Sequence, residues 1–130
     1  MNLVDSCGWL EYFADGPNAD FYATALEDPG SLIVPTICLL EVFKRILQQR
    51  GENAALQAAA AMHQGFVVPL DASLALGAAR ISRDLKLPLA DSVILATART
   101  YDAVIWTQDA HFQGLEGVRY TEATAPGRES

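Results

Sequence analysis

The chain has 130 residues, 51% of them hydrophobic, and its 16 acidic and 9 basic side chains give a formal net charge of −7. This length fits a single domain with a full apolar core, and no stretch approaches the ~20 apolar residues of a membrane span. The acidic balance argues against a polyanionic partner unless bound cations or a basic protein offset the repulsion. Because the N-terminus lacks signal-peptide features and Cys7 and Cys38 have no C-x-x-C spacing, we expect a cytoplasmic protein with free thiols.

Short apolar runs alternate with helical patterns through the first half of the chain. The run Asn2–Val4 predicts a buried strand, followed by a helix that Ser6 caps and that extends to about Phe13. Turn-forming Gly and Pro residues separate the elements that follow. These are predicted as a helix over Ala19–Glu27, a strand over Leu32–Val34, a helix from its N-cap Thr36 to Gly51, a helix over Asn53–Gln64 and a strand over Phe66–Val68.

The second half of the chain continues this alternation. The predicted elements are a helix over Ala72–Lys86 capped by Asp71, a helix from Pro88 to a turn at Tyr101–Asp102, a strand over Ala103–Trp106, a loop over Gln113–Gly117 and a strand over Val118–Tyr120. The alternation predicts an α/β fold, a three-layer sandwich with a central, largely parallel sheet of four to five short strands flanked by helices. We expect one domain over residues 1–120 and an unstructured polar tail over 121–130.

Acidic residues recur where a parallel sheet would place a ligand site, beyond the carboxyl ends of its strands. Asp5 follows the first predicted strand and Asp109 follows the strand near Ala103–Trp106. Glu41 lies on the second turn of the helix after the next strand, so it should point towards the same edge. Asp91 lies near the start of a helix that another helix precedes, so strict strand–helix alternation does not place it. We expect these four acids to converge.

Carboxylates gathered at one edge need positive charge or protons. Two carboxylates ~5 Å apart repel by about 3 kcal/mol at an effective dielectric near 20. An all-oxygen set favours Mg²⁺ or Mn²⁺ over zinc, and such ions promote hydrolysis of phosphodiesters. His63 and His111 have no carboxylate or histidine neighbour at ligand spacing, so surface or loop roles are expected for both.

Each acid also has a purely structural explanation. Asp5 or Asp91 would cap a helix, and Asp109 would cap a short turn over Ala110–Gln113. Glu41 would pair with the basic residue at i+4 on its own helix. Four acids that share one predicted edge favour the functional reading.

In chain order, four segments together resemble the PIN domain, and more narrowly the ribonuclease toxins of VapBC toxin–antitoxin modules. The segments are Asp5–Ser6 after the first strand, Glu41 in LLEVFKR, Asp91 in LADSVILATA, and Thr107–Gln108–Asp109 after an apolar strand. The resemblance extends from Met1 to about Tyr120.

This resemblance implies a parallel sheet, an acidic pocket holding Mg²⁺ or Mn²⁺, endonucleolytic RNA cleavage, homodimers and inhibition by a cognate antitoxin protein. The implied metal-binding and catalytic set is Asp5, Glu41, Asp91 and Asp109, with Asp5 and Asp91 as the closest ligands and Ser6 and Thr107 as supporting residues. Some relatives carry a second acid beside the last aspartate. Here Gln108 and Ala110 flank it, which leaves a second metal ion open.

The candidates for phosphate contacts are Lys44, Arg45, Arg80, Arg83, Lys86 and Arg99, whose spacing does not separate them from ordinary solvated charge. The leading hypothesis is therefore a metal-dependent endoribonuclease that acts as a toxin. One alternative is a phosphatase with Asp5 as nucleophile, but that chemistry needs a second aspartate where this chain has Cys7. The other is a non-catalytic acidic scaffold of the same fold that binds a basic protein.

Overall fold

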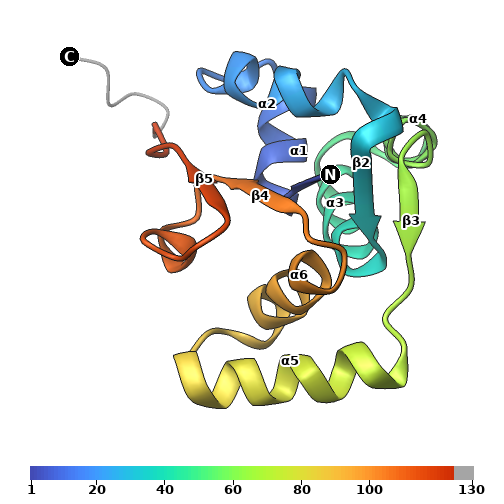
Figure 1. Cartoon of the computed structure of the whole chain (residues 1–130). Helices are drawn as coiled ribbons and strands as arrows, with labels where there is room; N and C mark the ends of the chain where they lie inside the picture. Colours follow the sequence, from blue (N-terminus) through green and yellow to red (C-terminus); the bar gives the residue numbers. More distant parts are fainter. Residues whose placement is uncertain (125–130) are drawn as a thin grey trace.

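The computed structural model describes residues 1–124 and contains one five-stranded sheet with the strand order β3-β2-β1-β4-β5. The strands are β1 (Asn2–Val4), β2 (Leu32–Pro35), β3 (Phe66–Val68), β4 (Val104–Thr107) and β5 (Val118–Tyr120). Every neighbouring pair is parallel. The predicted α/β fold with a parallel sheet is confirmed (Figure 1).

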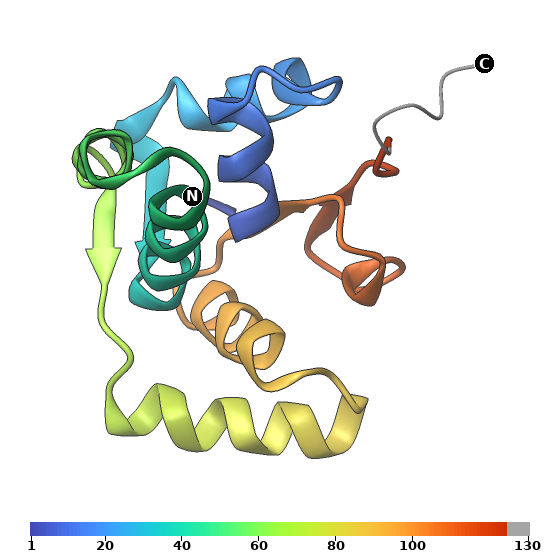
Figure 2. The ribbon, with the colours of Figure 1, turned by 180° about the vertical axis from the view of Figure 1, so that it is seen from behind.

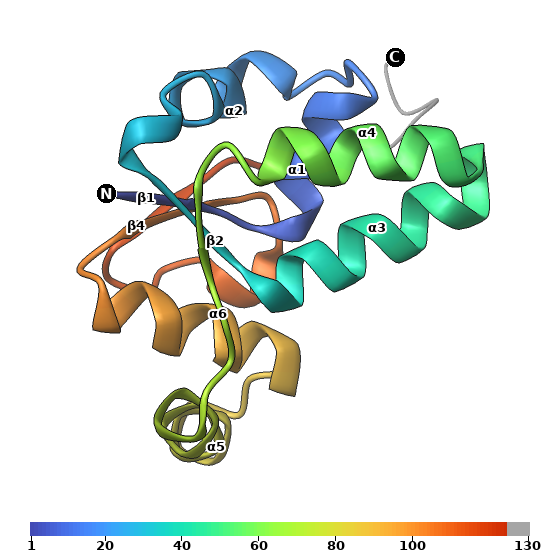
Figure 3. The same cartoon turned by 90° about the vertical axis from the view of Figure 1, so that its right-hand side faces the viewer.

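Among residues 1–124, six α-helices and two short 3-10 turns connect the strands. They are α1 (Ser6–Phe13), α2 (Ala19–Leu26), η1 (Pro29–Ser31), α3 (Thr36–Arg50), α4 (Glu52–Met62), α5 (Ala72–Leu85), α6 (Leu89–Thr100) and η2 (Ala110–Phe112). The chain steps outwards from β1 to β3 and then returns to β4. Because parallel crossovers are right-handed, the α3–α4 and α5–α6 pairs lie on different sides of the sheet (Figure 3). Figure 2 shows α1 beside α3.

The sheet is the centre of the core. Leu3, Val4, Ile33, Val34 and Ile105 are at most 1% exposed, so the central strands are buried on both faces. Short, continuous apolar runs of this kind are typical of strands that helices cover on both sides. Within residues 1–124, no helix is long and apolar enough to cross a membrane.

The helix caps differ from the prediction at two of three positions. Asp5, not Ser6, caps α1 by accepting the Ser6 N–H, and Thr36 is the first residue of α3 instead of its cap. The Thr36 hydroxyl accepts the Leu70 N–H at 3.3 Å, so it links the start of α3 to the loop between β3 and α5. Asp71 caps α5 as predicted. The predicted tail at 121–130 includes 125–130, which lie outside the described residues.

Two serines hold the turn between α5 and α6. Lys86 ends α5 with a left-handed φ of 55°. Ser82 Oγ donates to the Leu87 carbonyl at 2.7 Å, and Ser92 Oγ donates to the Pro88 carbonyl at 2.9 Å. This turn fixes where α6 begins, and therefore where the first-turn residue Asp91 lies.

Gly8 lets α1 pack closely against its neighbours, since a Cβ there would lie 2.4 Å from the Tyr22 ring and 2.6 Å from a Val4 methyl. We expect Gly8→Ala to lower the free energy of unfolding by about 1–3 kcal/mol through overpacking. Gly77, inside α5, has open space around its Cα, so Gly77→Ala should raise the free energy by about 0.5–1 kcal/mol. Urea unfolding of both variants measures the difference, and equal stability of Gly8→Ala and wild type would contradict this packing.

Candidate acidic metal site

Asp5 is the innermost acid of the site. It follows β1 directly and is only 4% exposed. Its Oδ1 accepts the Ser6 N–H at 2.7 Å, and its Oδ2 accepts the Thr107 hydroxyl at 2.8 Å and the Cys7 thiol at 3.4 Å. The capping explanation for Asp5 is thus correct, but it accounts for only one of these contacts.

Ser6 and Thr107 connect Asp5 to the other acids. Ser6 Oγ donates to Glu41 Oε1 at 2.7 Å, which links the start of α1 to α3. Thr107 Oγ1 donates to Asp5 and accepts the Asp109 N–H at 2.9 Å, which links the ends of β1 and β4. Ser6 therefore joins Glu41 to Asp5 through its hydroxyl and its backbone N–H, and the Thr107 hydroxyl joins Asp5 to Asp109.

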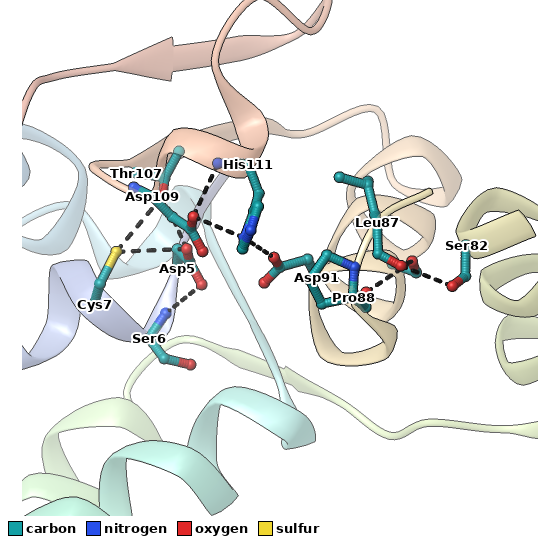
Figure 4. A network of polar contacts seen from close by, with 11 residues as sticks. Asp5, Ser6, Cys7, Ser82, Leu87, Pro88, Asp91, Thr107, Asp109 and His111 are labelled. Atoms are coloured by element: carbon teal, nitrogen blue, oxygen red, sulfur yellow. Dashed lines mark hydrogen bonds and ion pairs between the residues drawn. The ribbon is translucent and has the colours of Figure 1, made fainter. Parts of the chain in front are cut away.

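Asp91 and Asp109 face each other across the ring of His111 (Figure 4). His111 Nδ1 lies 3.0 Å from Asp91 Oδ2 and 3.1 Å from Asp109 Oδ1. The Asp91 side chain is 13% exposed, whereas that of His111 is 58% exposed. Asp109 also caps η2, as its structural explanation expected, by accepting the His111 N–H at 2.9 Å. Asp91 lies in the first turn of α6 but does not cap it, since no side chain accepts a capping hydrogen bond at the start of that helix.

The contact of His111 with two carboxylates contradicts the expectation that it has no acidic neighbour at ligand spacing. In an extended chain, residues two apart in sequence point the same way but do not enclose a site. Here the 3-10 turn after Asp109 folds the backbone back, so the ring reaches both Asp109 and the distant Asp91. The signal in the sequence was an aspartate two residues before the histidine, at a position where it could cap a short turn that contains the histidine.

The electrostatics show a site with too much negative charge. Burial raises the pKa of Asp5, repulsion from Asp109 adds to it, and the hydrogen bonds from Thr107, Ser6 and Cys7 oppose the rise. Burial and the neighbouring charges of Asp109 and Asp5 raise the pKa of Asp91 to about 6, although His111 opposes this shift. Both carboxyls therefore take up protons more readily than isolated ones.

Glu41 does not form the ion pair with Arg45 that its structural alternative required; its hydrogen bond goes to Ser6. Among the described residues, no lysine or arginine forms an ion pair with any of the four acids. Lys44 and Arg45 lie exposed on α3 and line a shallow surface hollow together with Glu41.

The other candidate phosphate contacts lie on α5 and α6. Arg80 and Lys86 are exposed, and Arg83 pairs with Asp84 at 2.8 Å. Arg99 lies in the last turn of α6, at the opposite end of that helix from Asp91. The structure therefore brings Lys44 and Arg45 beside one of the acids and places Arg99 away from them.

The residues at this site fit a divalent cation. Asp91, Asp109 and His111 each offer one ligand atom, and these atoms all lie within 4.8 Å of one another. Carboxylate oxygens are the ligands that Mg²⁺ and Mn²⁺ prefer. The raised pKa values of Asp5 and Asp91 reflect a cluster whose negative charge a cation would balance.

Comparison with known proteins agrees with this architecture. Residues 3–118 match the family model described as the PIN domain. None of the curated protein sequences matches the chain. Among solved structures, a toxin–antitoxin complex from Klebsiella pneumoniae is similar with a TM-score of 0.78 and 22% identity, covering 92% of this chain and 96% of that one.

Two further structures share the fold. A VapC toxin of Mycobacterium tuberculosis that cleaves the sarcin–ricin loop has a TM-score of 0.72 and 20% identity, covering 86% of this chain and 92% of that one. A DNA-bound VapBC complex from Salmonella typhimurium has a TM-score of 0.70 and 15% identity, covering 94% and 98%. At these identities the likeness establishes the fold alone.

Proposed function

This chain belongs to the PIN-domain family, and from that premise we propose that it is the toxin of a type II toxin–antitoxin module that cleaves RNA with a divalent metal ion. The observation that carries the proposal is the convergence of Asp5, Glu41, Asp91 and Asp109 from four separate elements into one linked network. Helix capping alone does not require such a network.

In this proposal, the four carboxylates hold Mg²⁺ or Mn²⁺, with Asp5 and Asp91 closest to the ion. When bound, the ion supplies neutralisation of phosphate charge and activation of water for hydrolysis of the phosphodiester. The residues of the chain perform the remaining tasks. Thr107 and Ser6 orient Asp5 through their hydrogen bonds and oppose the rise of its pKa. Glu41 Oε1 accepts the Ser6 hydroxyl, which leaves Oε2 to orient a water molecule or accept its proton.

The net charge of −7 makes the local cation essential for a polyanionic substrate, because the protein as a whole repels RNA. Lys44 and Arg45 are the best-placed phosphate contacts, since they share α3 with Glu41. Arg83 is a secondary candidate, and Arg99 would contact only RNA that extends along α6.

The proposed partners are a cognate antitoxin protein and a second copy of this chain, acting in the cytoplasm. Support comes from the structural relatives, of which one is a toxin–antitoxin complex and another a VapBC complex bound to DNA. A non-catalytic scaffold would have no need for four acids held in one network, so no observation favours that alternative.

The decisive test is RNA cleavage by the purified chain after removal of divalent ions with EDTA. We expect no cleavage in EDTA and recovery when Mg²⁺ or Mn²⁺ is added back, with Ca²⁺ and Na⁺ as ion controls. Cleavage that persists in EDTA would contradict a metal-dependent site. No cleavage with any ion, together with no ion binding by calorimetry, would favour the non-catalytic scaffold.

A further inference from the structure

His111 occupies an unusual place in the acidic site. Its backbone N–H and its ring Nδ1 both lie near Asp109, at 2.9 and 3.1 Å from Oδ1. The adjacent Phe112 is fully buried and anchors η2 to the core. The ring is therefore held against Asp91 and Asp109 by the fold, even though it is largely exposed (Figure 4).

The distances match those between ligands of one metal ion. Two ligand atoms about 2.1 Å from an ion and at right angles to each other are about 3.0 Å apart. His111 Nδ1 lies 3.0 and 3.1 Å from the nearest oxygens of Asp91 and Asp109. A hydrogen bond would produce the same spacing, so the chemistry of the donor set must separate the two roles.

We propose that His111 supplies Nδ1 as a ligand to the divalent ion held by Asp91 and Asp109, so that the site binds Mn²⁺ in preference to Mg²⁺. This inference rests on the proposed function, which places a divalent ion in the pocket. Mg²⁺ prefers a shell of oxygen atoms, whereas imidazole nitrogen suits first-row transition metals. An imidazole nitrogen among the carboxylate ligands therefore makes the site less suited to Mg²⁺ than carboxylates alone would.

The competing role for His111 is that of a positioning residue, which donates a hydrogen bond to the two carboxylates and never touches the ion. His111→Asn separates the two roles. The asparagine amide nitrogen lies close to the place of Nδ1 and still donates to Asp91 and Asp109, but an amide nitrogen is a poor metal ligand. The chain has one other histidine, His63, whose Nδ1 contacts the Ala59 carbonyl on α4, so His63→Asn is a matched control.

The experiment loads the ion-free full chain with one equivalent of Mn²⁺ and records the electron spin echo modulation from nitrogen nuclei. We expect imidazole nitrogen modulation in wild type and His63→Asn, and its loss in His111→Asn. Calorimetric titrations with Mn²⁺ and Mg²⁺ give the ratio of the Mn²⁺ affinity to the Mg²⁺ affinity. We expect this ratio to fall by at least about tenfold in His111→Asn, because loss of a residue that only supports a ligand already lowers metal affinity by about that factor.

Three outcomes would overturn the inference. Bound Mn²⁺ without imidazole modulation in wild type excludes histidine ligation. Equal losses of Mn²⁺ and Mg²⁺ affinity in His111→Asn, with an unchanged ratio, assign His111 a positioning role. In both cases Mg²⁺-dependent RNA cleavage would continue to support the proposed function. If wild type binds no divalent ion, this inference and the metal-dependent nuclease both fail.

Discussion

Asp91→Asn should reduce the rate of divalent-ion-dependent RNA cleavage by about two to three orders of magnitude. A loss of this size is usual when one group that stabilises charge in the transition state is removed. The substitution removes a negative charge and little else. The amide oxygen of asparagine can still accept from His111 Nδ1, which lies 3.0 Å from the carboxylate in wild type. The side chain is 13% exposed, so it also has room for the amide group.

Single-turnover cleavage of a short RNA with a fixed concentration of Mg²⁺ or Mn²⁺ measures this loss. Asp20→Asn is the matched control, because it makes the same chemical change at an exposed position on α2 and should leave the rate unchanged. A rate for Asp91→Asn within about threefold of wild type, too small a change for a lost charge-stabilising group, would remove Asp91 from the catalytic set.

Asp5→Asn should abolish cleavage as well, but it is the less specific variant. Asp5 Oδ1 and Oδ2 each accept a hydrogen bond, from the Ser6 N–H and from the Thr107 hydroxyl. An amide nitrogen accepts neither, so one donor loses its partner and the fold is destabilised by about 1–3 kcal/mol. Loss of activity in Asp5→Asn would therefore mix lost chemistry with altered structure.

The fold and part of the site could be predicted from general rules. Asp5 and Asp109 follow strands, and parallel strands end at one edge, so the alternation of elements alone predicts that they meet. Thr107 supports Asp5 because β1 and β4 are neighbours in register, with Val4 opposite Trp106.

The position of Asp91 could not be derived in this way. Two helices connect β3 to β4, and only the turn at Lys86 with its serine hydrogen bonds determines where the second begins. The contact of His111 with Asp91 and Asp109 depends likewise on a single 3-10 turn. Local turns of this kind are set by tertiary packing, which hydrophobic periodicity does not encode.

The stability of the protein should depend on divalent ions and on pH in a linked way. The pKa of Asp91 is raised to about 6 in the folded protein, against about 3.9 in an unfolded chain. Its contribution to stability is therefore fully present below about pH 3.9 and is lost as the pH rises through 6. Asp5 is affected in the same direction. Without ions at pH 8, burial and mutual repulsion of the ionised carboxylates lower the free energy of unfolding by their full amount.

Two stabilising effects are expected at pH 8, one from the ion and one from removal of the charge. A divalent ion at one hundred times its dissociation constant should raise the free energy of unfolding of wild type by about 2.7 kcal/mol. Asp91→Asn should raise that of the ion-free protein by about 1–2 kcal/mol, after allowance for partial exposure of the group, and should respond far less to ions. At pH 5 the ion-free gain should fall to about half, because Asp91 is then mostly protonated in the folded wild type but still mostly ionised in the unfolded chain.

Urea unfolding in EDTA and in Mn²⁺ at both pH values, with Asp20→Asn as control, measures all of these differences. If ion-free Asp91→Asn were destabilised equally at pH 5 and pH 8, the carboxylate would have a structural role and no charge cost. If the predicted pattern holds, the charge that strains the ion-free fold is the charge that binds the ion. Function and instability then have the same origin, because Asp5, Asp91 and Asp109 are placed close enough to repel one another.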